Sequence, residues 1–163
     1  MEHLWTPWRS TYVAGTDRPQ EGQCLFCIAA ERPDAENYVL HRGHYTFVML
    51  NLFPYTSGHL MIAPFAHVSR LQGMGQAARI EMMDLACQCE RILESVYHPE
   101  GLNLGMNLGE AAGAGIAGHL HLHVLPRWTG DANFMTTVGQ TRVMPESIAQ
   151  TYERLRPAFR SEP

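Results

Sequence analysis

The residues best suited to chemistry are three histidines that alternate with apolar residues late in the chain. The alternating residues are His119, Leu120, His121, Leu122, His123 and Val124. A period of two is typical of a β-strand, whose successive side chains point to opposite faces. We therefore expect the imidazoles to line a surface or cleft and the apolar side chains to pack on a core. Three imidazoles buried only for packing would need many hydrogen-bond partners, so the pattern favours a functional site.

Three chemical roles fit this histidine face. The imidazoles could hold one catalytic metal ion, as three histidines do in some zinc hydrolases. One neutral imidazole could instead attack phosphorus as a nucleophile, with its neighbours orienting it and contacting phosphate. The third possibility is a passive metal-binding strand. A glycine-rich loop upstream (109–118) and Arg127 downstream offer anion-binding groups, which favours the nucleophile.

A second group of candidate ligands is the pair Cys24 and Cys27. Two cysteines at this spacing suit tetrahedral zinc, and they equally suit a redox dithiol. The segment around them is rich in Gly, Pro and Glu and lacks the βαβ pattern of a thioredoxin-like site. A zinc site would need two further ligands from distant parts of the chain, for which histidines are the natural candidates.

The composition predicts one globular domain: 163 residues, 45% hydrophobic and 17% charged, with a formal net charge of −4. All twelve basic residues are arginine, which excludes a P-loop lysine or a Schiff base. The chain has no basic block for nucleic acid and no apolar run of the roughly 18 residues that span a bilayer. The N-terminus does not resemble a signal peptide, so we expect a cytoplasmic protein without nucleic-acid or membrane partners.

The strands that must position these residues follow from alternation and turn residues. The predicted strands are a hairpin over 38–50, a third strand at 59–64, a fourth at 102–108 and the histidine strand. Loops separate them at 51–58 and 109–118. The second loop matches GxGxxG at 113–118, but a strand follows it instead of a helix, which excludes a dinucleotide-binding fingerprint.

Two helices complete the predicted fold. The stronger pattern spans 76–97. Its predicted apolar stripe consists of Ile80, Met83, Ala86, Cys87, Leu93, Val96 and Tyr97. Cys87 and Cys89 diverge on this helix, so we expect both to be core or boundary residues and not ligands. Residues 145–156 begin with Pro and Glu, as a helix N-terminus does. The elements together predict an α+β domain with a mainly antiparallel sheet.

The histidine pattern with Val-Leu-Pro after it (124–126) resembles the signature of the histidine triad (HIT) superfamily of nucleotidyl transferases and hydrolases. Segments 51–59, 64–67 and 107–109 are similar to the family's ribose-binding loop, its Pro-x-x-His segment and its phosphate-side Asn. The N-terminal Trp-x-Pro-Trp-Arg arm and residues 128–135 resemble the bacterial branch of HIT-like diadenosine tetraphosphate phosphorylases. The resemblance covers nearly the whole chain. It implies a single HIT domain over 1–163, with an antiparallel sheet of about five strands, one long helix and a C-terminal helix.

The resemblance implies a role for each matching residue. His121 would attack the α-phosphorus, His123 would contact the phosphate or bridging oxygen, and His59 would support the imidazoles. Substrate contacts would come from Asn51 at the ribose, Leu52 and Phe53 at the base, and Asn107, Gly115 and Arg127 near the phosphates. The ligands of one structural zinc would be Cys24, Cys27, His67 and His119. With zinc in that role, a catalytic metal on the histidine face is no longer needed.

The implied activity is cleavage of a dinucleoside polyphosphate through a nucleotidyl-His121 intermediate. Many members carry a hydroxyl residue just before the triad, whereas residues 114–118 here read Ala-Gly-Ile-Ala-Gly, so the acceptor stays open between orthophosphate and water. The alternatives are a purine nucleoside phosphoramidate hydrolase and a non-catalytic nucleotide-binding regulator. The family usually forms homodimers by joining two sheets. An N-terminal arm of about 20 residues carries Trp5 and Trp8, which we expect to cover that seam, the core or a ligand.

Overall fold

The computed structural model describes residues 23–131, 138 and 144–161, and its elements surround one sheet. The strands are β1 (Val39–Arg42), β2 (Thr46–Leu50), β3 (Leu60–Pro64), β4 (Gly101–Gly105) and β5 (Leu122–Arg127). The helices are α2 (Leu25–Glu31), α3 (Asp34–Asn37), α4 (Gln76–Tyr97) and α6 (Ile148–Ser161), with 3-10 turns η1 (Leu71–Gly73) and η2 (Glu110–Ala112). The predicted arm with Trp5 and Trp8 lies outside the described residues.

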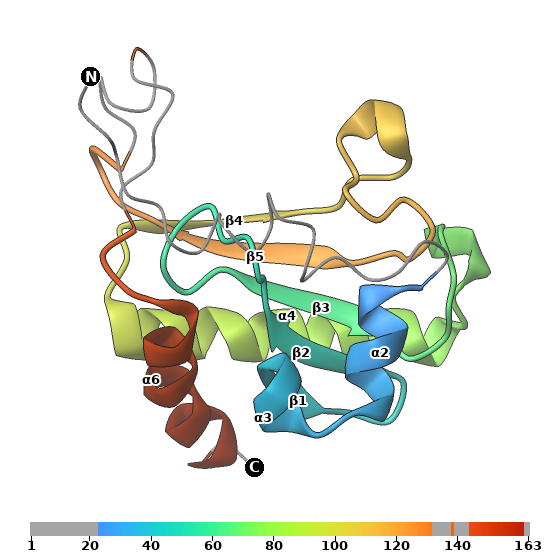
Figure 1. Ribbon diagram of the computed structural model, residues 1–163, viewed down its shortest axis with the longest axis horizontal. Coiled ribbons are helices and arrows are strands. Elements are labelled where there is room, and N and C mark those ends of the chain that lie inside the picture. The colour runs from blue at the N-terminus through green and yellow to red at the C-terminus, as the bar shows by residue number, and fades with distance from the viewer. Residues whose placement is uncertain (1–22, 132–137, 139–143, 162–163) are drawn as a thin grey trace.

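All pairs of neighbouring strands are antiparallel, in the order β1-β2-β3-β5-β4 (Figure 1). The five strands and the helices confirm the predicted α+β fold. β5 has a partner on each side, so His123 pairs with Met61 of β3 and with Gly105 of β4. The position of His123 is therefore fixed by hydrogen-bonded strands on both sides, whereas β1 and β4 form the edges of the sheet.

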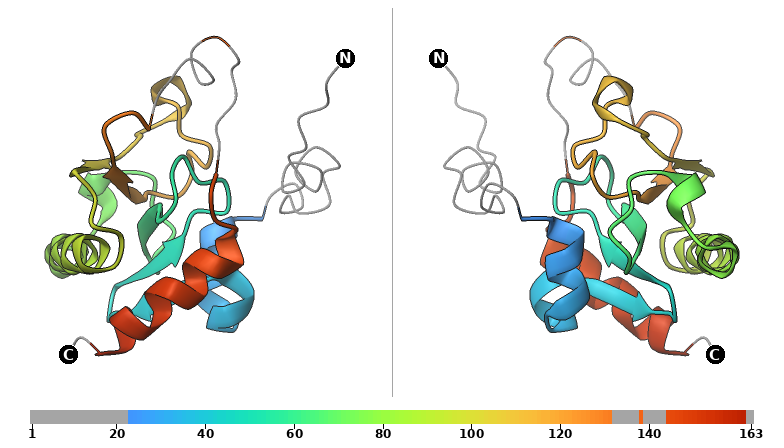
Figure 2. Two further views of the ribbon diagram at one scale, coloured as in Figure 1. Left: turned by 90° about the vertical axis from the view of Figure 1, so that its left-hand side faces the viewer. Right: turned by 90° about the vertical axis from the view of Figure 1, so that its right-hand side faces the viewer.

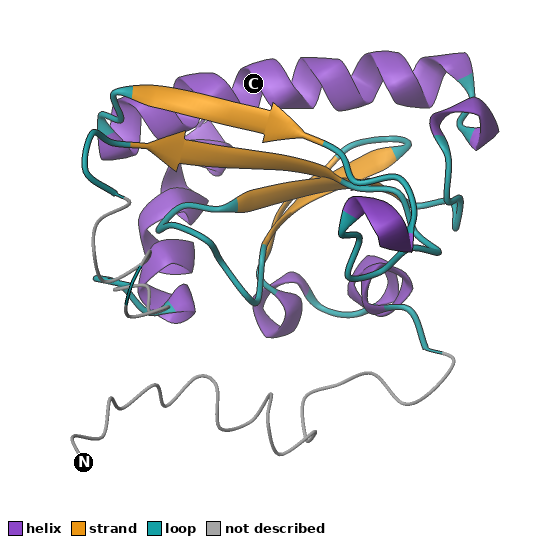
Figure 3. Ribbon diagram, turned by 90° about the horizontal axis from the view of Figure 1, so that it is seen from above, coloured by secondary structure: helices purple, strands orange, loops and turns teal. Residues whose placement is uncertain are grey.

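Different helices cover the two faces of the sheet. α4 runs along one face, and α2 lies on the other (Figures 2 and 3). Alternate side chains of the strands separate accordingly, because a strand sends neighbouring residues to opposite faces. Leu50, Leu60, Ile62, Leu122 and Val124 pack with α4 and α6. Phe47, Met49, Met61 and Ala63 pack with Phe26 and Ala29 of α2.

The helix α4 has the predicted bounds, but its buried face differs from the prediction. The buried residues are Met82, Leu85, Ala86, Gln88, Cys89, Ile92 and Leu93. Ile80 and Met83 are 55% and 53% exposed, and Cys87 is exposed, so the predicted stripe was wrong at these positions. The segment carries apolar residues on more than one side, and a helix that lies on a sheet buries only one stripe. Within the described residues, no helix is long and apolar enough to cross a membrane.

The C-terminal helix begins at Ile148 and not at Pro145. Its start is a capping box: the Gln150 amide donates to Ser147 Oγ (3.3 Å), and the Ser147 amide donates to Gln150 Oε1 (2.9 Å). The Ser-x-x-Gln pattern was thus the correct start signal. Tyr152, Leu155 and Phe159 are buried on the side of the helix that faces the core. The fourth strand is likewise shorter than predicted, at Gly101–Gly105.

Candidate functional site

The three histidines of the alternating motif lie at the start of β5, on the face that α2 covers. The paired strand begins at Leu122, so His119 and His121 lie just before it and His123 within it. The exposed fractions of His119, His121 and His123 are 1%, 5% and 8%. Leu120 packs in the opposite core with Leu122. The predicted alternation therefore holds, and the imidazoles occupy a nearly closed site.

His59, His121 and His123 form what we call the imidazole cluster. The main-chain N–H of Tyr55 donates to His59 Nδ1 (3.1 Å), so the proton of the neutral His59 ring is on Nε2. That nitrogen lies 2.9 Å from His123 Nδ1, which must accept. The proton of His123 is then on Nε2. One main-chain amide thus sets the tautomers of two rings.

His121 is oriented by its own chain. Its Nδ1 lies 2.9 Å from the main-chain oxygen of His119, which can only accept, so Nδ1 carries the proton. The lone pair is therefore on Nε2. The ring of His123 meets the ring of His121 at 4.8 Å between centroids and an angle of 76°. His121 thus has the tautomer that a nucleophile needs, beside a ring whose Nε2–H can donate a hydrogen bond.

Burial favours the neutral form of His119, His121 and His123. Removal from water lowers the pKa of His121, although the bond to the His119 oxygen opposes the change. Burial and the neighbouring His121 lower the pKa of His123 to about 4. Burial also lowers the pKa of His119. At pH 7 the rings offer lone pairs and N–H donors without net positive charge.

The Cys–His cluster consists of Cys24, Cys27, His67 and His119, whose ligand atoms all lie within 4.8 Å of one another. His119 Nε2 donates to the main-chain oxygen of Pro64 (2.9 Å), which turns Nδ1 toward the sulfurs. That Nδ1 is 3.3 Å from Cys24 Sγ and 3.7 Å from Cys27 Sγ. His67 Nδ1 is 3.3 Å from Cys27 Sγ. Two thiols and two imidazoles fit a closed tetrahedral zinc site.

Local structure explains how distant ligands meet. Cys24 precedes the first turn of α2 and Cys27 lies in that turn, so both sulfurs point to the same end of the helix. His67 follows β3, and the next residue, Val68, accepts a hydrogen bond from the Leu120 amide at 2.7 Å. This bond holds the loop after β3 beside the start of the histidine motif.

The predicted ribose-binding loop lies against the imidazole cluster. Asn51 directly follows β2 and is 9% exposed, and its Nδ2 lies 3.3 Å from His59 Nδ1. Its Oδ1 accepts from the Phe53 amide at 2.9 Å, which closes a turn. Leu52 is partly exposed, and Phe53 is 41% exposed. The structure thus places Asn51 beside His59, with Leu52 and Phe53 in the turn that follows.

The other predicted substrate contacts are more widely spread. Asn107 Nδ2 donates to the Gly113 oxygen at 3.4 Å, within the glycine-rich loop that also contains the exposed Gly115. Arg127 lies at the far end of β5, where Nε and Nη2 contact Asp131 at 2.6 and 2.9 Å. The carboxylate raises the pKa of Arg127. Arg127 therefore already has an anionic partner in the chain.

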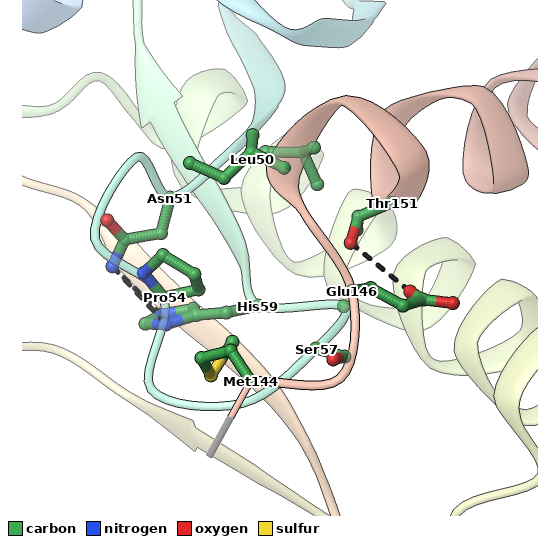
Figure 4. Close-up of a pocket in the computed structure, with 10 residues that line it drawn as sticks. Leu50, Asn51, Pro54, Ser57, His59, Met144, Glu146 and Thr151 are labelled. Carbon is green, nitrogen blue, oxygen red and sulfur yellow. Dashed lines mark hydrogen bonds between the residues drawn. The ribbon is translucent and has the colours of Figure 1, made fainter. Parts of the chain in front are cut away.

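A recess adjoins the imidazole cluster between the 51–59 loop and the segment 144–151 (Figure 4). Its volume is about 220 Å³ including the open mouth. Asn51 and His59 line one side, and Thr151 and Glu146 line the other. The hydroxyl of Ser57 is buried there without a hydrogen-bond partner among the described residues. His59 thus borders the C-terminal segment as well as β5.

Two residues of the site were not found from the sequence. The ring of Tyr55 lies 4.7 Å from that of His59 and 6.0 Å from that of His123. The ring of Phe26 lies 4.7 Å from that of His121. Phe26 lies between the two cysteines, and Tyr55 lies within the 51–59 loop. Only these positions within motifs could have indicated from the sequence that the two residues belong to the site.

The chain is similar in sequence and fold to known proteins. A family model described as the HIT domain matches residues 32–130. A protein named AP-4-A phosphorylase from Mycobacterium tuberculosis is 36% identical over 169 residues, covering 100% of this chain and 87% of that protein. A solved structure of a Zn-bound histidine triad family protein from Mycobacterium smegmatis has a TM-score of 0.68 and 25% identity, covering 85% of this chain and 94% of that one. A hypothetical histidine triad nucleotide-binding protein from Sulfolobus tokodaii shares the fold, with a TM-score of 0.64, 22% identity, and coverage of 84% and 92%.

Proposed function

Because the chain belongs to the HIT domain family, we propose that it cleaves dinucleoside polyphosphates at the α-phosphorus through a nucleotidyl-His121 intermediate. The similarity to AP-4-A phosphorylase over the full chain supports this substrate class. The observation that carries the chemistry is the hydrogen bond from His121 Nδ1 to the His119 oxygen. It leaves Nε2 of a buried, neutral ring as the nucleophile.

The reaction divides into two displacements at one phosphorus atom. In the first, His121 Nε2 bonds to the α-phosphorus, and the bond from phosphorus to the bridging oxygen breaks. His123 Nε2–H donates a hydrogen bond to that oxygen, and the nucleoside polyphosphate leaves as an anion. In the second, orthophosphate or water attacks the same phosphorus and the N–P bond breaks, which returns the lone pair to His121 Nε2. A proton that the acceptor releases passes to solvent. The product is a nucleoside diphosphate with orthophosphate and a nucleoside monophosphate with water.

The substrate contacts are proposed in the places that the family resemblance gives them. Asn51 binds the ribose hydroxyls, and Leu52 and Phe53 contact the base. Asn107, the Gly115 amide and Arg127 serve the phosphates. The position of Asn51 beside His59 supports the first assignment, because the ribose would then lie next to the reacting phosphorus. Arg127 would have to share its guanidinium between Asp131 and the substrate.

We also propose that the Cys–His cluster binds one structural Zn²⁺. The donor set supports this, and so does the similarity to the Mycobacterium smegmatis protein, which is a Zn-bound family member. When bound, the ion would supply no reacting group and would cross-link chain segments. Its protein ligands would hold α2 and the loop after β3 against the start of the histidine motif. Because one of these ligands is His119, the ion would also help to position His121, two residues later in the chain.

For the assembly we propose a cytoplasmic homodimer of single HIT domains, each spanning 1–163 with the N-terminal arm. The exposed edge strand β4, with Leu104 46% exposed, supports pairing of two sheets along that edge. Cys24, Cys27 and Cys87 form no disulfide within the described residues, which suits a reducing compartment. Sedimentation at twice the chain mass would support the dimer, and a monomer at all concentrations would exclude it.

The function is tested by incubating the protein with diadenosine tetraphosphate, with and without orthophosphate. We expect ADP and ATP with orthophosphate, or AMP and ATP without it, and a covalent nucleotidyl adduct by intact-mass analysis after rapid quenching. Faster turnover of an adenosine phosphoramidate would favour the phosphoramidate hydrolase. Tight nucleotide binding with neither product nor adduct would identify a non-catalytic regulator and contradict the proposal.

A further inference from the structure

Phe26 joins the cysteine-bearing helix to the proposed nucleophile. It stands between Cys24 and Cys27 on α2 and is 1% exposed. Its ring centroid lies 4.7 Å from that of His121, with 33° between the planes, and 5.0 Å from that of His119. A single aromatic ring therefore packs against one residue of each histidine cluster.

The helix that carries Phe26 is held at both ends. At its N-terminal end, Cys24 and Cys27 lie within the Cys–His cluster. At its C-terminal end, Arg42 donates from Nη1 to the Ala30 oxygen (2.7 Å) and from Nη2 to the Ala29 oxygen (2.8 Å). The same guanidinium contacts the Arg32 oxygen and the Asp34 carboxylate. Arg42 is on β1, so the sheet itself fixes the distance of α2 from the histidine motif.

The hydrogen bond of His121 does not by itself fix the direction of its lone pair. The Nδ1 proton reaches a main-chain oxygen only two residues back, and the His123 ring meets the imidazole at 76°, so neither contact packs flat against the imidazole plane. The direction matters because attack on phosphorus needs a near-linear approach, and small misplacements of reacting groups cost up to about 10²-fold in rate. A second contact on the ring face is therefore required.

We propose that Phe26 is a positioning residue for His121: its ring, set in place by α2, holds the imidazole plane so that Nε2 faces the phosphorus. This inference rests on the proposed function of His121. The ring of Phe26 does not touch substrate and acts only through the imidazole. Because α2 also carries Cys24 and Cys27, any displacement of the Cys–His cluster would reach the nucleophile through this contact.

The test compares Phe26→Leu with Phe47→Leu. Phe47 is a matched control, because it is 0% exposed, packs in the same apolar cluster and has an aromatic partner, Phe65, at 5.2 Å. It is not among the aromatic neighbours of the imidazoles. Both variants remove one buried ring, so both should lose comparable stability.

We expect Phe26→Leu to slow formation of the nucleotidyl adduct by about 10- to 100-fold in single-turnover measurements. Substrate affinity should stay within about threefold, since Phe26 does not contact substrate. Phe47→Leu should keep the adduct rate within about threefold of wild type. Without substrate, ¹³C relaxation of the His121 ring should show increased motion in Phe26→Leu alone, and metal content should match wild type in both.

Phe26→Met, whose longer and more flexible side chain can fill the space left by the ring, is measured in parallel in case the leucine variant folds poorly. Equal slowing by the Phe26 and Phe47 variants would overturn the inference, as would a wild-type adduct rate in a folded Phe26 variant. If His121→Ala abolishes the adduct while Phe26→Leu does not slow it, only the inference fails. If His121→Ala still turns over, the proposed function itself fails.

Discussion

The Cys–His cluster and the imidazole cluster both use histidine side chains, but the lone pair is on a different ring nitrogen in each. In the Cys–His cluster, His119 gives Nε2–H to the Pro64 oxygen and turns Nδ1 to the sulfurs. In the imidazole cluster, His121 gives Nδ1–H to the His119 oxygen and keeps the lone pair on Nε2. The two rings are separated by one residue. Their different chemistry therefore follows from the main-chain oxygen that each ring reaches.

The largest effects are expected when one ring is removed from each cluster, which tests whether His119 and His121 have different roles. We expect His121→Ala to lower turnover of diadenosine tetraphosphate by at least about 10⁴-fold, because no other group replaces the nucleophile. Its melting temperature should change little. His119→Ala should instead lose bound metal and stability. Steady-state rates, thermal melts and metal analysis on both variants test this, and turnover by His121→Ala above about 0.1% of wild type would contradict it.

The sequence predicted what depends on local periodicity. The alternation at 119–124 predicted which residues share a face, because the side chains of a strand alternate whatever lies around them. The stripe of α4 was mispredicted at Ile80 and Met83, because only the position of the sheet decides which of several apolar sides is buried. The start at Ile148 was missed although its capping box was present in the sequence.

The partners of the site side chains were harder to predict. Family resemblance supplied the grouping of Cys24 with His67 and His119, since spacing alone left the further ligands open. The choice of ring nitrogen depends on the Pro64 oxygen, 55 residues away from His119, and on a main-chain amide of the 51–59 loop. Such contacts form only when distant segments pack together, so no local sequence pattern predicts them.

Metal removal should affect the Cys–His cluster first. If wild type binds zinc with free metal at about 1,000 times the Kd, chelation removes about 4 kcal/mol of stability. For a chain of this size the melting temperature would fall by roughly 10 °C. Cys24→Ser should show the low value without chelator. Cys87→Ser is the matched control, because Cys87 is an exposed thiol on α4 outside the cluster.

If chelation does not change the melting temperature of the wild-type protein, the proposal that the Cys–His cluster binds a structural zinc ion is wrong. That result would also return Cys24 and Cys27 to the redox alternative, which a shift on adding a thiol reductant would support.

Acid should affect the imidazole cluster through His123, whose pKa is lowered to about 4 by burial and by His121. The folded state keeps this ring neutral, whereas the unfolded chain takes up a proton below about pH 6.5. Stability is therefore fully present above pH 6.5 and is lost as the pH falls toward 4, by up to about 3 kcal/mol. His123→Asn cannot take up this proton, so its stability should fall less between pH 7 and pH 4.5.

Urea unfolding at the two pH values measures the difference between wild type and His123→Asn. The exposed His44 provides the control, since His44→Asn should lose as much stability as wild type. An equal loss in all three proteins would show that His123 is not held neutral by the fold.

The smallest expected effect concerns the tautomer of His123, which His59 sets by donating Nε2–H to Nδ1 at 2.9 Å. His59→Leu removes the donor, and we expect kcat to fall about tenfold, the value of one net hydrogen bond. His59→Gln places an amide N–H where the imidazole N–H was, so it should stay within about threefold of wild type. Rates measured at saturating substrate separate the two variants, and equal loss in both would contradict the assignment. If an amide donor restores the rate, His59 acts on His123 by its hydrogen bond and not by its ring. The Pro64 oxygen acts on His119 in the same way. In each cluster, a single hydrogen bond to the imidazole then decides which of its nitrogens carries the proton.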